Sequence, residues 1–88
     1  MQQLIKMIEE AVANGNVISV FHEGRNTISC CSFIPYEYDF NGQIRIEGER
    51  CVLNITNLNG MDIFYDEFEN EFHVHFEDED IYITILDN

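Results

Sequence analysis

The chain begins with a helical pattern of apolar residues. Polar residues such as Lys6 and Glu9 lie between the apolar ones, so that a single face is hydrophobic and a helix is predicted over residues 2–14. The apolar residues of this face are Leu4, Ile5, Ile8, Ala11 and Val12. Gly15 follows, and glycine readily adopts the left-handed conformation that ends many helices.

After residue 16 the pattern changes to the alternation of polar and apolar residues that is typical of β-strands. Short runs of this kind are separated by glycine, asparagine and acidic residues. They cover residues 17–22, 27–34, 36–40, 43–47, 51–56, 62–65, 71–77 and 81–86. Asn-Gly at residues 41–42 suits a type I′ hairpin turn, a second Asn-Gly stands at 59–60, and residues 78–80 are predicted to form the turn of the last hairpin.

These patterns predict an α+β fold with one N-terminal helix packed on a curled antiparallel sheet or a small barrel of six to seven short strands. A chain of 88 residues has room for one domain, over residues 1–88, with an antiparallel β region over residues 16–87.

The last hairpin contains the only closely spaced pair of histidines in the sequence. In residues 71–77, Phe72, Val74 and Phe76 would face the core, which leaves His73 and His75 on the opposite face together with Glu71 and Glu77. Histidines two residues apart on a strand can reach one metal ion, but no third histidine and no cysteine lies near them in the sequence. We therefore predict neither a metal site nor a cofactor. Whether the pair responds to pH or binds a divalent metal stays open, and a metal binder is the weakest alternative function.

The net charge is the unusual feature of the composition. The 17 Asp and Glu residues outnumber the 4 Lys and Arg residues, for a formal charge of −13. Residues 1–50 hold four basic and seven acidic residues, or −3, whereas residues 51–88 hold ten acidic residues and no Lys or Arg, or −10. This charge disfavours direct binding to nucleic acid or to an anionic membrane.

The cysteines, the first residues and the serines bear on the compartment and on possible catalysis. Cys30 and Cys31 are adjacent and point to opposite faces of a strand, and Cys51 is the remaining cysteine, so reduced thiols and a cytoplasmic location are the simplest interpretation. The start of the chain lacks the apolar run of a signal peptide. A Ser–His–acid triad that includes His22 would need a nucleophilic serine, and no serine lies in the glycine pattern of a nucleophile elbow. We therefore predict that the protein is not an enzyme.

Three segments, "NVISVFH", "IPYEYDFNGQIRIEG" and "NITNLNGMDIF", follow the helix in an order that resembles WYL-type domains, which are Sm-like small barrels of bacterial regulators. The resemblance extends over roughly residues 4–64 and implies a small-barrel scaffold. The Trp-Tyr-Leu signature is absent, since the chain has no Trp, and the basic ligand-binding residues of that family have no counterpart here.

Nine acidic residues lie between positions 62 and 80, with no Lys or Arg among them. Fixed carboxylates on an ordered surface imitate the phosphates of a nucleic-acid duplex and attract basic proteins. Aromatic residues in the same segment would anchor such an interface. The predicted partner-binding residues are Asp62, Tyr65, Asp66, Glu67, Phe68, Glu69, Glu71, Glu77, Asp78, Glu79 and Asp80.

In size and charge the chain resembles the phage-encoded acidic DNA mimics, such as uracil-DNA glycosylase inhibitor and several anti-CRISPR proteins. The resemblance implies an inhibitor of a basic nucleic-acid-binding protein such as a CRISPR effector or nuclease. Two alternatives stay open: an immunity protein that neutralises a nuclease toxin, and a regulatory Sm-like or WYL-like barrel that self-assembles, in the simplest case as a homodimer.

Overall fold

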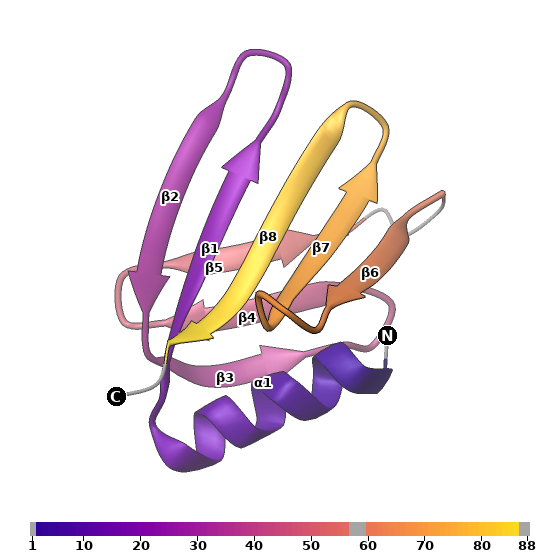
Figure 1. Cartoon of the computed structure of the whole chain (residues 1–88). Helices are drawn as coiled ribbons and strands as arrows, with labels where there is room; N and C mark the ends of the chain where they lie inside the picture. The colour runs from indigo at the N-terminus through magenta and orange to yellow at the C-terminus, as the bar shows by residue number, and fades with distance from the viewer. Residues whose placement is uncertain (1, 57–59, 87–88) are drawn as a thin grey trace.

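The computed structural model describes residues 2–56 and 60–86, which contain one helix and eight strands (Figure 1). In chain order the elements are α1 (Gln2–Asn14), β1 (Val17–Glu23), β2 (Ile28–Phe33), β3 (Pro35–Asp39), β4 (Ile44–Gly48), β5 (Val52–Ile55), β6 (Asp62–Asp66), β7 (Glu71–Phe76) and β8 (Glu79–Leu86). The expected α+β class is confirmed. The Asn-Gly turn at 59–60 and the end of the β region at residue 87 fall partly or wholly outside the described residues.

Within residues 2–56 and 60–86 the strands form two antiparallel sheets and no closed barrel, so the barrel alternative and the count of six to seven strands were wrong. The larger sheet has the order β2-β1-β8-β7-β6, and the smaller has the order β3-β4-β5. The chain passes from one sheet to the other at Ile34, between β2 and β3. Pro35 lies at the start of β3, one of the few strand positions that tolerate a residue without an N–H group.

The hydrophobic core lies between the two sheets. In Figure 1 the strands of the smaller sheet run across those of the larger one, and α1 lies along β3 at one end of the molecule. The fully or almost fully buried residues come from all three layers: Leu4, Ile8 and Ala11 of the helix, Ile18, Val20, Phe72, Val74, Ile81 and Ile83 of the larger sheet, and Ile44, Ile46 and Ile55 of the smaller one. The predicted apolar faces of the helix and of β7 are therefore confirmed.

The helix ends as its sequence indicates. Gly15 has a φ of 66°, the N–H of Gly15 donates to the carbonyl of Val12, and the N–H of Asn16 donates to the carbonyl of Ala11. This pair of bonds is the Schellman motif, which satisfies carbonyls at the last turn of a helix.

Two predicted turns differ from the structure. Asn41 does not have the positive φ that a type I′ turn requires, and β3 and β4 are joined by residues 40–43. The Asp39 carboxylate accepts hydrogen bonds from the Asn41 N–H and the Gln43 side chain, which stabilises this longer loop and lowers the pKa of Asp39.

The last hairpin turn contains two residues, Glu77 and Asp78, rather than residues 78–80. Glu77 takes a φ of 52°, which lets the chain reverse early. Asp80 consequently belongs to β8 and lies opposite His75 of β7. Within the described residues, no helix is long and apolar enough to cross a membrane.

Replacement of Gly48 by alanine should destabilise the fold. A Cβ at this position would collide with the Phe33 ring and lie 3.0 Å from the Ile34 carbonyl oxygen, at the point where the chain changes sheets. We expect a loss of about 1–3 kcal/mol, the usual cost of overpacking. Urea denaturation measures it, with Gly24→Ala as the control, since the nearest neighbour there is the flexible Glu79 side chain at 3.3 Å. Equal effects of the two changes would contradict this packing argument.

Candidate functional site

The outer face of the larger sheet is the side turned away from the smaller sheet. Residues alternate along each strand, so those between the buried positions point outward. From β6 to β1, the outward residues of the four adjacent strands are Asp62, Phe64 and Asp66; Glu71, His73 and His75; Asp80, Tyr82 and Thr84; and Ser19, Phe21 and Glu23. We call this surface the outer face.

A row of four rings crosses the middle of the outer face. Phe64, His73, Tyr82 and Phe21 lie opposite one another on successive strands. The His73 and Tyr82 rings are stacked with centroids 4.4 Å apart, and Phe64 and Phe21 lie 6.0 Å from His73 and Tyr82, respectively. Phe64 at the end of the row is 56% exposed, so the row offers aromatic surface to a partner.

Carboxylates lie on both sides of this aromatic row. Asp62, Asp80 and Glu23 lie on one side, and Asp66 and Glu71 lie on the other. Their field reaches the centre of the face. Partial burial raises the pKa of the Tyr82 hydroxyl, and the charges of Asp80, Glu23 and Glu71 raise it further.

At one end of the outer face lies a hollow of about 490 Å³ beside the β6–β7 turn. Its residues combine rings with carboxylates: Phe64, Tyr65, Asp66, Glu67, Phe68, Glu71, His73 and Tyr82. The Asp66 carboxylate also accepts hydrogen bonds from the backbone N–H groups of Phe68 and Glu69, which holds the turn in place. Phe68 is fully exposed.

The predicted partner-binding residues do not form one cluster. Asp62, Asp66, Glu71 and Asp80 lie on the outer face, whereas Glu67, Phe68 and Glu69 lie in the turn before β7 and Glu77 and Asp78 in the turn after it. The two turns are at opposite ends of β7, which has six residues and is therefore roughly 17–20 Å long.

Two of the predicted residues point elsewhere. Glu79 lies on the inward side of β8, where its carboxylate is 2.9 Å from His22 Nε2. Tyr65 packs its ring on Phe72 beside the helix, with the two ring centroids 4.7 Å apart, although it also borders the hollow.

Asp78 lies 3.8 Å from Arg25, and both side chains are exposed, so this ion pair adds little stability.

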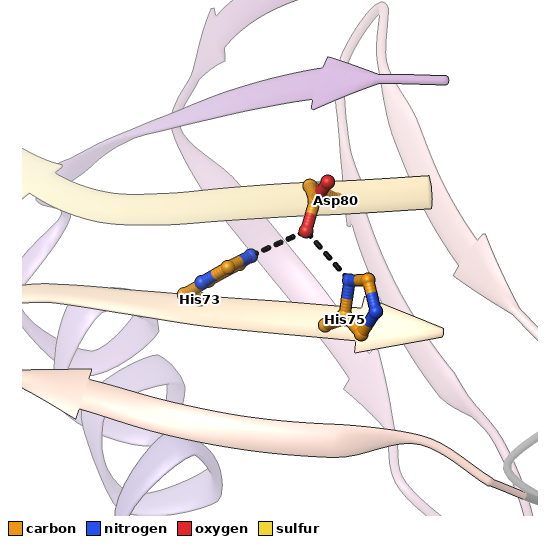
Figure 2. Close-up of side chains that lie close together, drawn as sticks. All are labelled: His73, His75 and Asp80. Carbon is orange, nitrogen blue, oxygen red and sulfur yellow. Dashed lines mark hydrogen bonds and ion pairs between the residues drawn. The ribbon is translucent and has the colours of Figure 1, made fainter. Parts of the chain in front are cut away.

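At the other end of the outer face the two histidines share one carboxylate (Figure 2). Asp80 Oδ1 lies 2.6 Å from His73 Nε2 and 2.8 Å from His75 Nδ1. The hydrogen bond from His73 and then that from His75 lower the pKa of the Asp80 carboxyl. The stripe predicted along β7 is retained except at Glu77, which lies in the turn.

Sequence reasoning missed several residues of the outer face. Phe21 and Glu23 come from β1, which is distant in sequence from the acidic segment, and only the pairing of β1 with β8 brings them there. Alternation along residues 17–22 and 81–86 is the signal that could have placed Phe21 and Tyr82 away from the core, but it does not show that they are neighbours.

The cysteines also differ from the expected reduced state. The structure joins Cys31 of β2 and Cys51, just before β5, by a disulfide that links the two sheets, and Cys30 is free and exposed. Cys31 lies on the inward side of its strand, so the disulfide is on the opposite side of the sheet from the outer face.

No model of a known protein family matches the chain, and no curated protein and no solved structure matches it either. The function is therefore inferred from the side chains and their arrangement.

Replacement of His73 by Phe should raise the pKa of Asp80. The phenyl ring keeps an aromatic group on Tyr82 but removes the Nε2 atom that bonds to Asp80. Because the folded-state pKa of Asp80 is lowered, its carboxylate stabilises the fold above the ordinary aspartate pKa of about 3.9, and this contribution is lost as the pH falls through the lower folded value. The variant should therefore lose less stability than the wild type as the pH falls from the ordinary aspartate pKa through the lowered pKa of folded Asp80.

An NMR titration of the aspartate carboxyl carbons measures this effect. His22→Gln serves as the control, because His22 pairs with Glu79 on the inward side. An Asp80 pKa that is equal in the wild type and in His73→Phe would contradict the assignment.

Proposed function

We propose that the protein is a non-enzymatic inhibitor that binds a basic nucleic-acid-handling protein, such as a CRISPR effector or another nuclease, through its acidic outer face. The observation that carries the proposal is the hollow beside the β6–β7 turn, which combines aromatic rings with the carboxylates of Asp66, Glu67 and Glu71. A carboxylate-lined aromatic hollow suits the side chain of an arginine or a lysine.

Charge supports a basic partner over other kinds of ligand. The formal charge of −13 attracts a positively charged groove over long range and repels nucleic acids and anionic membranes. Such attraction raises the association rate more than the affinity, so the aromatic residues are needed for a long-lived complex. Phe64 and Phe68, both exposed, are placed to supply this contact area.

The spacing of the charges supports mimicry of a duplex. Asp62 and Asp66 stand four residues apart on β6, which corresponds to roughly 13 Å along a strand. They begin the two lines of carboxylates that border the aromatic row. The separation is comparable with the width of the DNA major groove, about 12 Å, whose borders are lines of phosphates.

Two other roles are supported by features of the larger sheet, one by its acidic outer face and one by its edge strand β2. Neutralisation of a nuclease toxin would use the same acidic face. Self-association is favoured by a separate observation: β2 is an edge strand of the larger sheet, and its sequence Ile28–Phe33 contains no charged residue to prevent pairing with another chain.

A target that handles nucleic acid implies action in the cytoplasm, where thiols are kept reduced. The Cys31–Cys51 disulfide would then be open in the cell. Because the disulfide lies on the inward side of the larger sheet, the outer face does not depend on it for any of its contacts.

The acidic hollow should be required for partner binding. We expect Asp66→Asn, Glu67→Gln and Glu71→Gln together to weaken partner binding by at least about 10-fold, since removing charges that pair with a basic side chain inside a hollow costs more than removing charges at an interface rim. The test immobilises the protein, captures proteins from bacterial lysate, and elutes them with a salt gradient and then with duplex DNA. Affinity for the captured protein is then measured for both forms.

The matched control changes three exposed acids away from the outer face, Glu9→Gln, Glu10→Gln and Glu49→Gln, and so alters the net charge equally. Equal weakening by the two triple variants, or a captured protein that duplex DNA does not displace, would overturn the proposal. Size-exclusion chromatography of the same samples reports self-association separately.

Partner binding should be unaffected by reduction of the disulfide. We expect dithiothreitol to lower the thermal stability of the protein, because the disulfide closes a loop between residues 20 positions apart, while the affinity for the partner at 25 °C stays unchanged. Calorimetric titration with and without reductant measures this. Loss of binding in the reduced form would contradict a cytoplasmic role.

A further inference from the structure

The cluster of His73, His75 and Asp80 has the composition of a metal site. Each of the three residues offers one ligand atom, an imidazole nitrogen or a carboxylate oxygen, and these atoms all lie within 4.8 Å of one another. Figure 2 shows the Asp80 carboxylate, on β8, directed at both rings, which come from the adjacent strand β7.

The backbone positions the three side chains. His73 and His75 are two residues apart on β7, so both point to the outer face, and the two-residue turn of Glu77 and Asp78 sets Asp80 opposite His75. The residues therefore stand on paired strands rather than on a loop, and strands hold a ligand geometry more accurately than loops do.

The His73 ring is also held by its neighbours. It stacks on Tyr82 at an interplanar angle of 16° and lies 6.0 Å from the Phe64 ring. Side-chain exposure is intermediate for the cluster, 31% for His73, 45% for His75 and 29% for Asp80, so an ion from solvent can reach it.

We propose that His73, His75 and Asp80 bind one divalent ion of the zinc class, with the fourth coordination position open to water. Two imidazole nitrogens and one carboxylate oxygen are donors that Zn²⁺, Ni²⁺ and Co²⁺ accept readily, whereas Mg²⁺ and Ca²⁺ prefer oxygen ligands alone. This inference does not rest on the proposed function, because it needs no partner protein.

The observed distances require only small side-chain movements. In a tetrahedral zinc site with bonds near 2.1 Å, neighbouring ligand atoms are about 3.4 Å apart. The two nitrogens now lie 2.6 and 2.8 Å from Asp80 Oδ1, so each would move away from that oxygen by less than about 1 Å as the ion enters. The ligand atoms all lie within 4.8 Å of one another, so no pair would have to approach by more than about 1.4 Å. Each neutral imidazole then carries its proton on the nitrogen that does not bind the ion.

The surroundings favour a cation at this position. Asp62 of β6 lies opposite His75, and Glu23 of β1 lies opposite Asp80, so two more carboxylates flank the cluster. Their negative charge adds to the attraction for a divalent ion. The remaining histidine, His22, pairs with Glu79 on the inward side and is a natural control.

The test uses the whole protein after removal of metal by a chelator. Zn²⁺ is titrated calorimetrically at moderate salt with excess Mg²⁺, which occupies sites made only of carboxylates. The absorption spectrum with Co²⁺ reports the coordination geometry. The variants are His73→Phe, which keeps a ring on Tyr82, His75→Asn, Asp80→Asn and the control His22→Asn, and circular dichroism confirms that each is folded.

We expect one ion per chain, a tetrahedral Co²⁺ spectrum, and an affinity reduced by more than about 100-fold in each of the three cluster variants, since even outer-shell changes cost about 10–100-fold. His22→Asn should bind as the wild type does. The proposal is overturned by no uptake of Zn²⁺, by uptake that survives in the double variant His73→Phe/His75→Asn, or by its loss in His22→Asn.

A measurement on the wild type avoids dependence on the variants. The imidazole NMR signals of His73 and His75 should shift on addition of one equivalent of Zn²⁺, while those of His22 stay in place. Shifts at His22 alone, or none at any histidine, would also overturn the assignment.

Discussion

The pairing of β1 with β8 is the contact on which the rest of the structure depends. It joins the first strand to the last, from Val17 opposite Leu86 to Glu23 opposite Asp80. β8 lies at the centre of the larger sheet because it also pairs with β7. A slip of one residue in this register would turn Ile81 and Ile83 toward water, so burial of these side chains holds the register in place.

The same register builds the outer face from parts that are remote in sequence. Strong negative charge destabilises a compact chain by self-repulsion, and the carboxylates of the larger sheet lie where water and salt reduce that repulsion. Local hydrogen bonds offset part of what remains: Thr84 donates to Glu71, the β6–β7 turn donates to Asp66, and the two histidines contact Asp80. The result is a set of carboxylates held at defined positions rather than on flexible segments.

The outer face has different chemistry at its two ends. The hollow beside the β6–β7 turn combines rings and carboxylates and suits a basic side chain, whereas the cluster near the β7–β8 turn combines imidazoles with a carboxylate and suits a metal ion. His73 belongs to both, since it lines the hollow and contacts Asp80. The stacked His73 and Tyr82 rings therefore connect the two ends physically.

Local patterns in the sequence determined the helix with its glycine end, the alternation of the strands, the core positions Phe72 and Val74, and the acidic character of the C-terminal half. These features depend on neighbours within one turn or one strand, so a single sequence contains them. A small barrel was one of the two arrangements expected, and the described strands form two separate sheets instead. The same strand pattern is compatible with a barrel and with two sheets, so it could not decide between them.

Tertiary structure alone decided which faces meet. Glu77 adopts a positive φ, which is uncommon for a residue other than glycine, and the resulting short turn moves Asp80 from a loop onto a strand beside the histidines. Phe21 and Glu23 reach the outer face, and Cys51 reaches Cys31, only through contacts between segments far apart in sequence. Such contacts are set by the burial of a common core, and local sequence pattern does not determine which strands that core brings together.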